Sequence, residues 1–274
     1  MSLSPDRLAR IVAVLLAALA VSACGSDDKD SERYVERPVQ ELYNEAVDAL
    51  RNEQYTRAAE RFDDVERQHP YSVWAVKASL MAAFSHYQAT DYDEAVLALN
   101  RFIQLHPGNS DIAYAYYLRA LCFYERISDV VRDQLNTEKA LAALREVVRR
   151  FPETSYARDA RLKIDLTRDH LAGKEMDVGR YYLTRGHYLA AIRRFRRVVE
   201  IYETTTHIPE ALHRLTEAYL ALGLKNEATK AAAVLGHNYP GSEWYVDSYA
   251  LVGGGSLPKP EERGFLTRAF DWVF

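Results

Sequence analysis

The sequence predicts an all-α protein, an α-solenoid of five helix-turn-helix repeats that spans residues 38–240. The first observation is a repeat, because Ala58 lies 37 residues before Ala95, and Pro70 lies 37 residues before Pro107. The second is composition, since the chain is rich in Ala, Leu, Glu and Arg and has only 12 Gly, which favours helices over strands. The third is the prolines themselves, because a proline pushes the preceding residue out of the α region and ends a helix.

Each repeat supplies two helices, and each helix has a small side chain at a fixed place. In the second helix this residue is alanine, and in the first helix it is alanine, glycine or threonine. Small side chains at these places let the two helices approach closely. The second helices are expected in residues 55–70, 92–107, 137–152, 188–203 and 225–240, with Ala58, Ala95, Ala140, Ala191 and Ala228 facing Ala46, Ala83, Ala120, Gly179 and Thr216.

Two of the spacings between repeats are longer than the others. Ala95 and Ala140 are 45 residues apart, and Ala140 and Ala191 are 51 residues apart. The first excess predicts a longer loop near residues 125–137, inside the third repeat. The second excess predicts either an additional helix or a lengthened one in residues 155–177, where apolar residues recur at helical spacing.

The N-terminus has the pattern of a secretory signal peptide. Two arginines precede an uncharged run of 13 residues, 11–23, which is shorter than the about 20 residues that a membrane-spanning helix needs. The run ends in Val-Ser-Ala before Cys24, and this resembles the bacterial lipobox. By that resemblance residues 1–23 are removed, Cys24 carries the acyl chains, and residues 24–37 form a tether. Gly25, which follows the cysteine, favours the outer membrane as the location of such a lipoprotein. The alternative is an ordinary signal peptide that happens to precede a cysteine.

Composition and motifs argue against several functions. The net charge is −4, or −5 without residues 1–23, which hold one acidic and two basic residues, so a nucleic-acid-binding polycation is excluded. The eight histidines show no metal-ligand spacing, and the glycines in residues 251–258 lack the lysine of a phosphate loop. We therefore expect no metal, no cofactor and no enzyme activity, with a hydrolase that uses histidine and acidic residues as the alternative. Cys122 is expected to be a small, buried apolar residue.

Residues 179–188 resemble the tetratricopeptide-repeat signature, with Gly179, Tyr182, Gly186 and Tyr188 at its positions. That resemblance implies that the first helices line a concave surface. We expect the side chains on this surface to bind an extended peptide, because tyrosine combines a rigid apolar ring with a polar tip. Simple packing between repeats is the alternative. The side chains predicted to line this groove are Tyr43, Val47, Phe84, Tyr87, Tyr114, Tyr117 and Tyr124.

Residues 34–240 resemble the BamD family of outer-membrane β-barrel assembly lipoproteins. Three stretches carry the likeness, residues 101–121, 147–165 and 181–194, which are similar to the family's second to fourth repeats. The resemblance implies a scaffold that is lipid-anchored on the periplasmic face of the outer membrane. Its expected partners are the barrel-inserting protein BamA, other lipoproteins of the assembly complex and unfolded outer-membrane proteins. A repeat lipoprotein that scaffolds cell-wall enzymes is the alternative.

The second helix of the fourth repeat is unusually basic. It carries Arg193, Arg194, Arg196 and Arg197. The family resemblance implies that Arg194 corresponds to an arginine at the contact with BamA, and arginine suits such a contact through paired hydrogen bonds to carboxylates. A solvated basic face without a partner is the alternative.

The family resemblance stops after the last repeat. Residues 241–263 contain glycines and prolines and are interpreted as a linker. Residues 264–274 have the spacing of a short amphipathic helix, which is too short to be stable alone. Phe265, Phe270 and Trp272 therefore need a surface to cover them. We expect a partner subunit, and the alternatives are a cap on the chain's own solenoid or the membrane interface.

Overall fold

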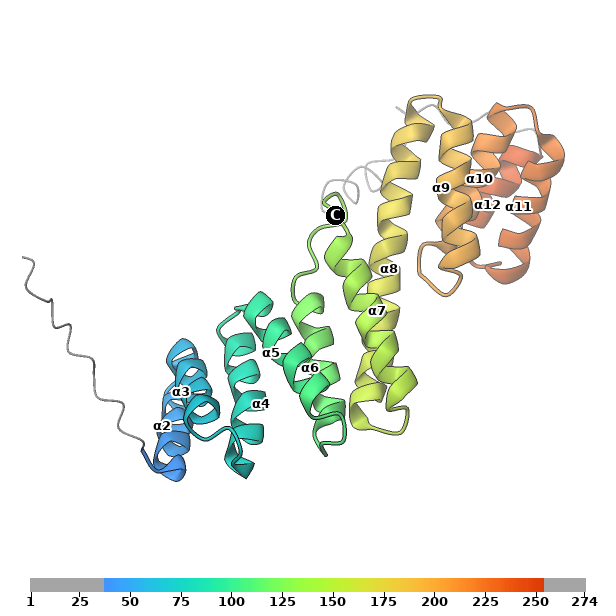
Figure 1. Ribbon diagram of the computed structural model, residues 1–274. Coiled ribbons are helices and arrows are strands. Elements are labelled where there is room, and N and C mark those ends of the chain that lie inside the picture. The colour runs from blue at the N-terminus through green and yellow to red at the C-terminus, as the bar shows by residue number, and fades with distance from the viewer. Residues whose placement is uncertain (1–36, 254–274) are drawn as a thin grey trace, which may run out of the picture. The chain divides into compact units, whose positions relative to one another are not determined.

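A computed structural model describes residues 37–253, and these form an all-helical solenoid without strands (Figure 1). The chain divides into two units after Pro38, and all eleven described helices belong to the second unit. The helices are α2 (Val39–Arg51), α3 (Tyr55–Gln68), α4 (Val73–Gln88), α5 (Tyr92–Leu105), α6 (Ile112–Tyr124), α7 (Leu135–Arg150), α8 (Ser155–Thr184), α9 (Tyr188–Ile201), α10 (Ile208–Ala221), α11 (Lys225–Asn238) and α12 (Glu243–Val252).

The helices pack in the order in which they follow along the chain. Every helix from α2 to α11 contacts the next one, which gives the five pairs α2–α3, α4–α5, α6–α7, α8–α9 and α10–α11. The first helices of neighbouring pairs also touch, because α4 contacts α2 and α6, and α8 contacts α6 and α10. The predicted α-solenoid of five helix-turn-helix repeats is therefore confirmed.

The small residues predicted at the helix contacts are all buried. The five alanines of the second helices and the four non-glycine residues of the first helices have no exposed surface. Gly179 allows the closest approach, since a Cβ atom at this position would lie 2.4 Å from Cε1 of Phe195. Phe195 is itself fully buried in α9, so its ring occupies the space that a larger residue on α8 would need.

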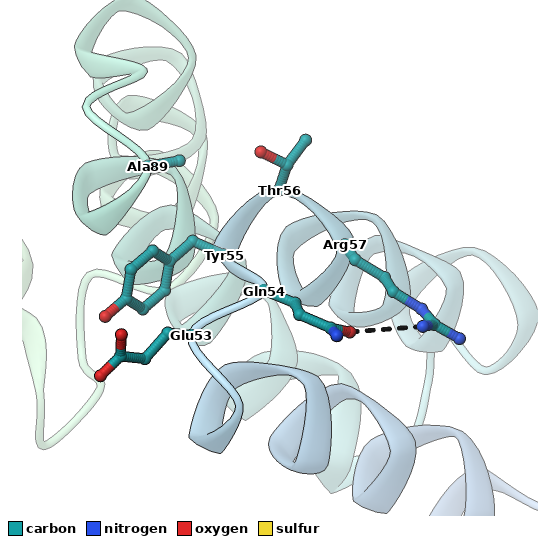
Figure 2. Close-up of a pocket in the computed structure, with 6 residues that line it drawn as sticks. All are labelled: Glu53, Gln54, Tyr55, Thr56, Arg57 and Ala89. Carbon is teal, nitrogen blue, oxygen red and sulfur yellow. Dashed lines mark hydrogen bonds between the residues drawn. The ribbon is translucent and has the colours of Figure 1, made fainter.

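Four of the turns inside repeats share one backbone conformation. Each contains a residue with positive φ, which glycine adopts freely and which costs energy for a residue with a side chain. Figure 2 shows the first of these turns, where Glu53 and Gln54 line an open depression and Arg57 donates a hydrogen bond to Gln54 (3.3 Å). The φ angles are 58° at Glu53, 62° at Thr90, 74° at Gly186 and 75° at Gly223.

The second helices also end alike. The residue after each has φ between −115° and −135° and ψ between 37° and 57°. These residues are spaced by 37, 45, 51 and 37 positions, the same spacings that separate the alanines. The extra residues of the long repeats therefore lie before the alanines of the second helices, and not between each alanine and the end of its helix. The five end residues are His69, His106, Phe151, Tyr202 and Tyr239.

The first insertion is a loop, as expected, although α7 already begins at Leu135 and so takes in the end of the predicted residues 125–137. The side-chain amide of Gln134 fastens this loop by donating to the carbonyl oxygens of Asp129 (3.1 Å) and Arg132 (3.0 Å). A buried amide that satisfies several backbone carbonyls holds a loop in one conformation.

The second insertion lengthens a helix instead of adding one. α8 is a single helix of 30 residues, and the Thr154 hydroxyl caps it by accepting a hydrogen bond from the backbone N–H of Ala157 (3.2 Å). The first half of α8 places Ala160 in a core shared with α6 and α7. The second half places Met176 in the core shared with α9 and α10. One helix therefore joins two hydrophobic cores.

A helix occupies part of the predicted linker. The prediction of a linker over residues 241–263 is wrong for Glu243–Val252, because these residues form α12 and pack against α10 and α11. Trp244 makes the contact, with its ring 5.1 Å from that of His213 and 5.2 Å from the guanidinium carbon of Arg214. Aromatic stacking, and not the alanine pattern of the repeats, attaches this helix.

Cys122 lies on α6 inside a core that includes Leu99 and Leu118. The residue is fully buried, and this burial raises the pKa of its thiol to about 12. The thiol therefore stays neutral, and the prediction of a small, buried apolar role is confirmed.

Some of the predicted features lie outside the described residues. These are the signal peptide, Cys24 and the aromatic residues Phe265, Phe270 and Trp272. Within residues 37–253, no helix is both long enough and apolar enough to cross a membrane.

The close approach at Gly179 predicts that Gly179→Ala destabilises the protein. Overpacking against Phe195 costs about 1–3 kcal/mol, and the better helix propensity of alanine returns only about 1 kcal/mol, so urea unfolding should show a net loss. Gly108→Ala is the control, because no atom lies within 4 Å of a Cβ there. Phe195→Leu should reduce the effect of Gly179→Ala in a double-mutant cycle. A gain in stability for Gly179→Ala would contradict this contact.

Candidate functional site

Aromatic side chains lie together on the first helices of the second, third and fourth repeats. Phe84, Tyr87 and Tyr114 pack beside one hydrophobic core, and Tyr117, Tyr124 and Tyr156 pack beside the next. Each of these side chains is half-buried, so each contributes both to the core and to the surface. We call this set of six residues on α4, α6 and α8 the aromatic face.

Tyr156 holds the centre of the aromatic face together. Its ring centroid lies 5.6 Å from that of Tyr114 and 5.3 Å from that of Tyr117. These separations are in the range of favourable aromatic contacts. Because Tyr156 lies on α8 and the other two on α6, the contacts also join the third repeat to the fourth.

Two hydroxyl groups on the aromatic face donate hydrogen bonds to carboxylates of the same chain. Tyr117 donates a hydrogen bond to Asp159, and Tyr87 donates one to Glu125 (3.5 Å). Burial, and then the carboxylate of Glu125, raises the pKa of Tyr87 to about 12. Burial and the hydrogen bond to Asp159 also raise the pKa of Tyr117. Both phenols therefore remain neutral near pH 7, and each keeps lone pairs that can accept a further hydrogen bond.

A lysine on α8 contacts the aromatic face. The ammonium group of Lys163 lies 4.8 Å from the ring centroid of Tyr124 and 3.7 Å from Oδ2 of Asp159. The positive charge of Lys163 thus compensates the negative charge of Asp159, which accepts the hydrogen bond of the Tyr117 hydroxyl. Tyr156, Asp159 and Lys163 were not among the residues that sequence reasoning selected, although their spacing of three and four places them on one side of α8.

Two of the seven predicted groove residues lie elsewhere. Tyr43 and Val47 are on α2 and pack against the first hydrophobic core. The ring of Tyr43 lies 4.8 Å from that of Trp74 and 5.5 Å from that of Phe62. The other five predicted residues belong to the aromatic face. Packing between helices, the alternative considered for all seven, describes part of the role of each.

The arginines of α9 have different environments. Arg194 donates to Oε2 of Glu175 at 3.0 Å, and Nε of Arg197 lies 3.2 Å from Oε1 of the same carboxylate. Arg196 instead pairs with Glu200 on its own helix, whereas Arg193 is exposed. The prediction that these residues bind a partner remains a prediction.

Glu175 is the unexpected member of this group. Its side chain is only 11 % exposed, so the carboxylate depends on the two arginines for its charge compensation. A buried charge that loses its partner destabilises a protein strongly, by about 3–5 kcal/mol when nothing replaces the partner. Arg194 is therefore not simply a solvated surface residue, because it links α9 to α8.

This pair predicts that Arg194→Glu destabilises the protein by about 1–3 kcal/mol, since Glu175 loses one partner and gains a repelling charge while Arg197 remains. Adding Glu175→Gln should recover much of the loss, because it removes the repulsion. Arg193→Glu is the matched control on the same helix and should change the free energy of unfolding by less than about 0.5 kcal/mol. Equal effects of the two arginine variants in chemical denaturation would show that the ion pair is not structural.

A protein family and several named relatives match most of this chain. The family description "Outer membrane lipoprotein" (YfiO) matches residues 35–235. Relatives named outer membrane protein assembly factor BamD include one from Caulobacter vibrioides, 52% identical over 90% of this chain and 81% of its own. Another from Rickettsia prowazekii is 49% identical over 88% of this chain and 95% of its own, and one from Neisseria meningitidis is 34% identical over the same shares.

Solved tetratricopeptide structures are much more distant. A thermophilic protein from Thermus thermophilus is 17% identical, with a TM-score of 0.36 over 79% of this chain and 97% of its own. The family assignment rests instead on the match to residues 35–235 and on the relatives that cover most of the chain. This chain belongs to the BamD family of outer membrane protein assembly factors.

Proposed function

We propose that this protein is a lipid-anchored, non-enzymatic scaffold of the outer-membrane assembly machinery, held at the periplasmic face of the outer membrane. It receives unfolded outer-membrane proteins on the aromatic face and binds the barrel-inserting subunit through α9. The observation that carries the proposed binding of unfolded proteins is the set of half-buried rings on α4, α6 and α8. Within it Tyr156 contacts Tyr114 and Tyr117, and the Tyr117 hydroxyl donates a hydrogen bond to Asp159.

The aromatic face suits an unfolded barrel strand. Such a strand alternates apolar and polar residues over about ten positions, and it exposes backbone N–H groups until it is inserted. Exposed ring surface can cover the apolar side chains. The hydroxyl groups of Tyr87 and Tyr117 use their hydrogens on Glu125 and Asp159, so their lone pairs can accept hydrogen bonds from the strand's backbone.

The arginines of α9 suit an acidic surface on the barrel-inserting subunit. Arg193 and Arg196 are exposed, and Arg194 retains a partly exposed guanidinium while it pairs with Glu175. Guanidinium groups have several donors, so one that is held by an internal carboxylate can still bind a carboxylate of the partner. The ion pair would then orient Arg194 for the contact.

Purification of the complete tagged chain in mild detergent tests the proposal as a whole. A β-barrel insertase should co-purify in amounts close to those of the tagged chain. Recovery of a peptidoglycan synthase in place of the insertase would contradict the proposal and support a scaffold for cell-wall enzymes.

The aromatic face predicts a specific loss of peptide binding. Phe84→Ala and Tyr117→Ala should each weaken binding of a peptide copied from a barrel's last strand by about 1–3 kcal/mol, as measured by fluorescence anisotropy. Tyr117→Phe keeps the ring and should lose less than Tyr117→Ala. Tyr71→Ala is the control, because that side chain is fully exposed between helices. Unchanged affinity in variants that retain the helical circular dichroism spectrum would assign both residues to packing alone.

The lipid anchor predicts the behaviour of Cys24→Ala. Because the thiol accepts the first acyl group, this variant should incorporate no labelled palmitate and should remain unprocessed at the inner membrane or appear in the periplasm. Cell fractionation with immunoblotting measures the location, and Cys122→Ala serves as the control, since this buried cysteine should not affect labelling. Palmitate in the Cys24→Ala protein would rule out Cys24 as the lipidated residue.

A further inference from the structure

The last helix of the solenoid is firmly attached on its inner side. Ser248 and Leu251 are buried, and the Ser248 hydroxyl is 2.9 Å from Nδ1 of His213 on α10. Tyr245 packs on α11 so closely that a Cβ atom at Gly236 would lie 2.3 Å from its ring. α12 is therefore a docked part of the fold, and its orientation is fixed.

The exposed side of α12 carries apolar residues beside Glu243 and Asp247. Val246 is 65% exposed and Tyr249 is 69% exposed, and Ala250 is also exposed. Residues three and four positions apart lie side by side on a helix, so these three form one strip, the outer strip of α12.

The other end of the solenoid is different. The terminal helices of a solenoid need a polar outer side for solubility, and α2 meets this requirement. The exposed residues of α2 are Gln40, Glu41, Asn44, Asp48 and Arg51. The α12 end of the solenoid thus exposes apolar residues, whereas the outer side of the α2 end is polar.

We propose that residues 264–274 of this same chain cover the outer strip of α12. The segment lies outside the described residues, and its sequence places Phe265, Ala269, Phe270 and Val273 at helical spacing. The apolar side of residues 264–274 therefore needs a surface to pack against, and the outer strip of α12 in the same molecule is exposed and apolar.

The length of chain between the two strips fits this arrangement. Ten residues, 254–263, separate the end of the described chain from the segment. A flexible chain of this length has a mean end-to-end distance of about 17 Å, and a ten-residue helix such as α12 is about 15 Å long. The segment is thus held near α12 at an effective concentration in the millimolar range.

Charge also favours α12 over a membrane. Glu243 and Asp247 are exposed on α12, and Arg268 and Asp271 leave residues 264–274 without net charge. Residues 264–274 contain only one basic side chain, which gives little attraction to anionic lipid. A pair between Arg268 and an acidic residue of α12 would favour one docking orientation.

Removal of the tail tests the proposal. A chain that ends at Gly253 should melt about 2–4 °C lower than the complete chain, the shift that the loss of one apolar contact gives at this size. Its α12 amides should exchange hydrogen faster. Tyr249→Glu in the complete chain should reproduce both changes and should add little to the truncation. Leu189→Glu is the matched control, since Leu189 is also 69% exposed but lies on α9.

A cross-link tests the contact itself. In a Cys24→Ala background, the pair Tyr249→Cys and Phe270→Cys should form an intramolecular disulfide on mild oxidation, whereas Leu189→Cys and Phe270→Cys should not. Unchanged melting after truncation together with equal cross-linking of both pairs would overturn the proposal. So would protection of α12 that appears only when lipid vesicles or the barrel-inserting subunit are added, because the strip would then belong to the membrane or to the partner.

Discussion

The close approach of the two helices in each repeat sets the geometry of the entire solenoid. At Gly179 the ring of Phe195 occupies the position where a Cβ atom would be, and alanine or threonine fills the matching place in the other repeats with no exposed surface. Since a small residue recurs at the same place in each helix pair, neighbouring pairs stack in a similar manner. The first helices then contact one another directly, which is the condition for an aromatic face that crosses three repeats.

The long helix α8 gives the two candidate binding regions a common support. Its first half belongs to the core shared with α6 and α7 and carries Tyr156, which contacts the tyrosines of α6. Its second half belongs to the core of the last repeats and carries Glu175, which pairs with Arg194 and Arg197 of α9. A helix that is buried in two cores resists bending between them. The aromatic face and the arginines of α9 therefore share one continuous helix.

The repeat period was sufficient to predict the five helix pairs and the buried alanines, because that pattern is local and recurs. The repeat pattern does not reveal Tyr156, because it lies 23 residues before Gly179, in the turns of α8 that the other repeats lack. Glu175 could not be paired with Arg194 from sequence, since their contact depends on how α8 and α9 cross. α12 cannot be recognised from the repeat pattern, because aromatic side chains attach it in place of the alanines.

The two candidate regions differ in the forces that they offer a ligand. On the aromatic face the phenols of Tyr87, Tyr114 and Tyr117 have raised pKa values, chiefly because of burial, and stay neutral. Contacts there depend on apolar burial and on hydrogen bonds to neutral groups, and salt screens both of these interactions little. The arginines of α9 act through charge, and contacts between exposed charges weaken as ionic strength rises. The proposed client strand and the proposed acidic partner would therefore use different physical interactions and different side chains of one scaffold.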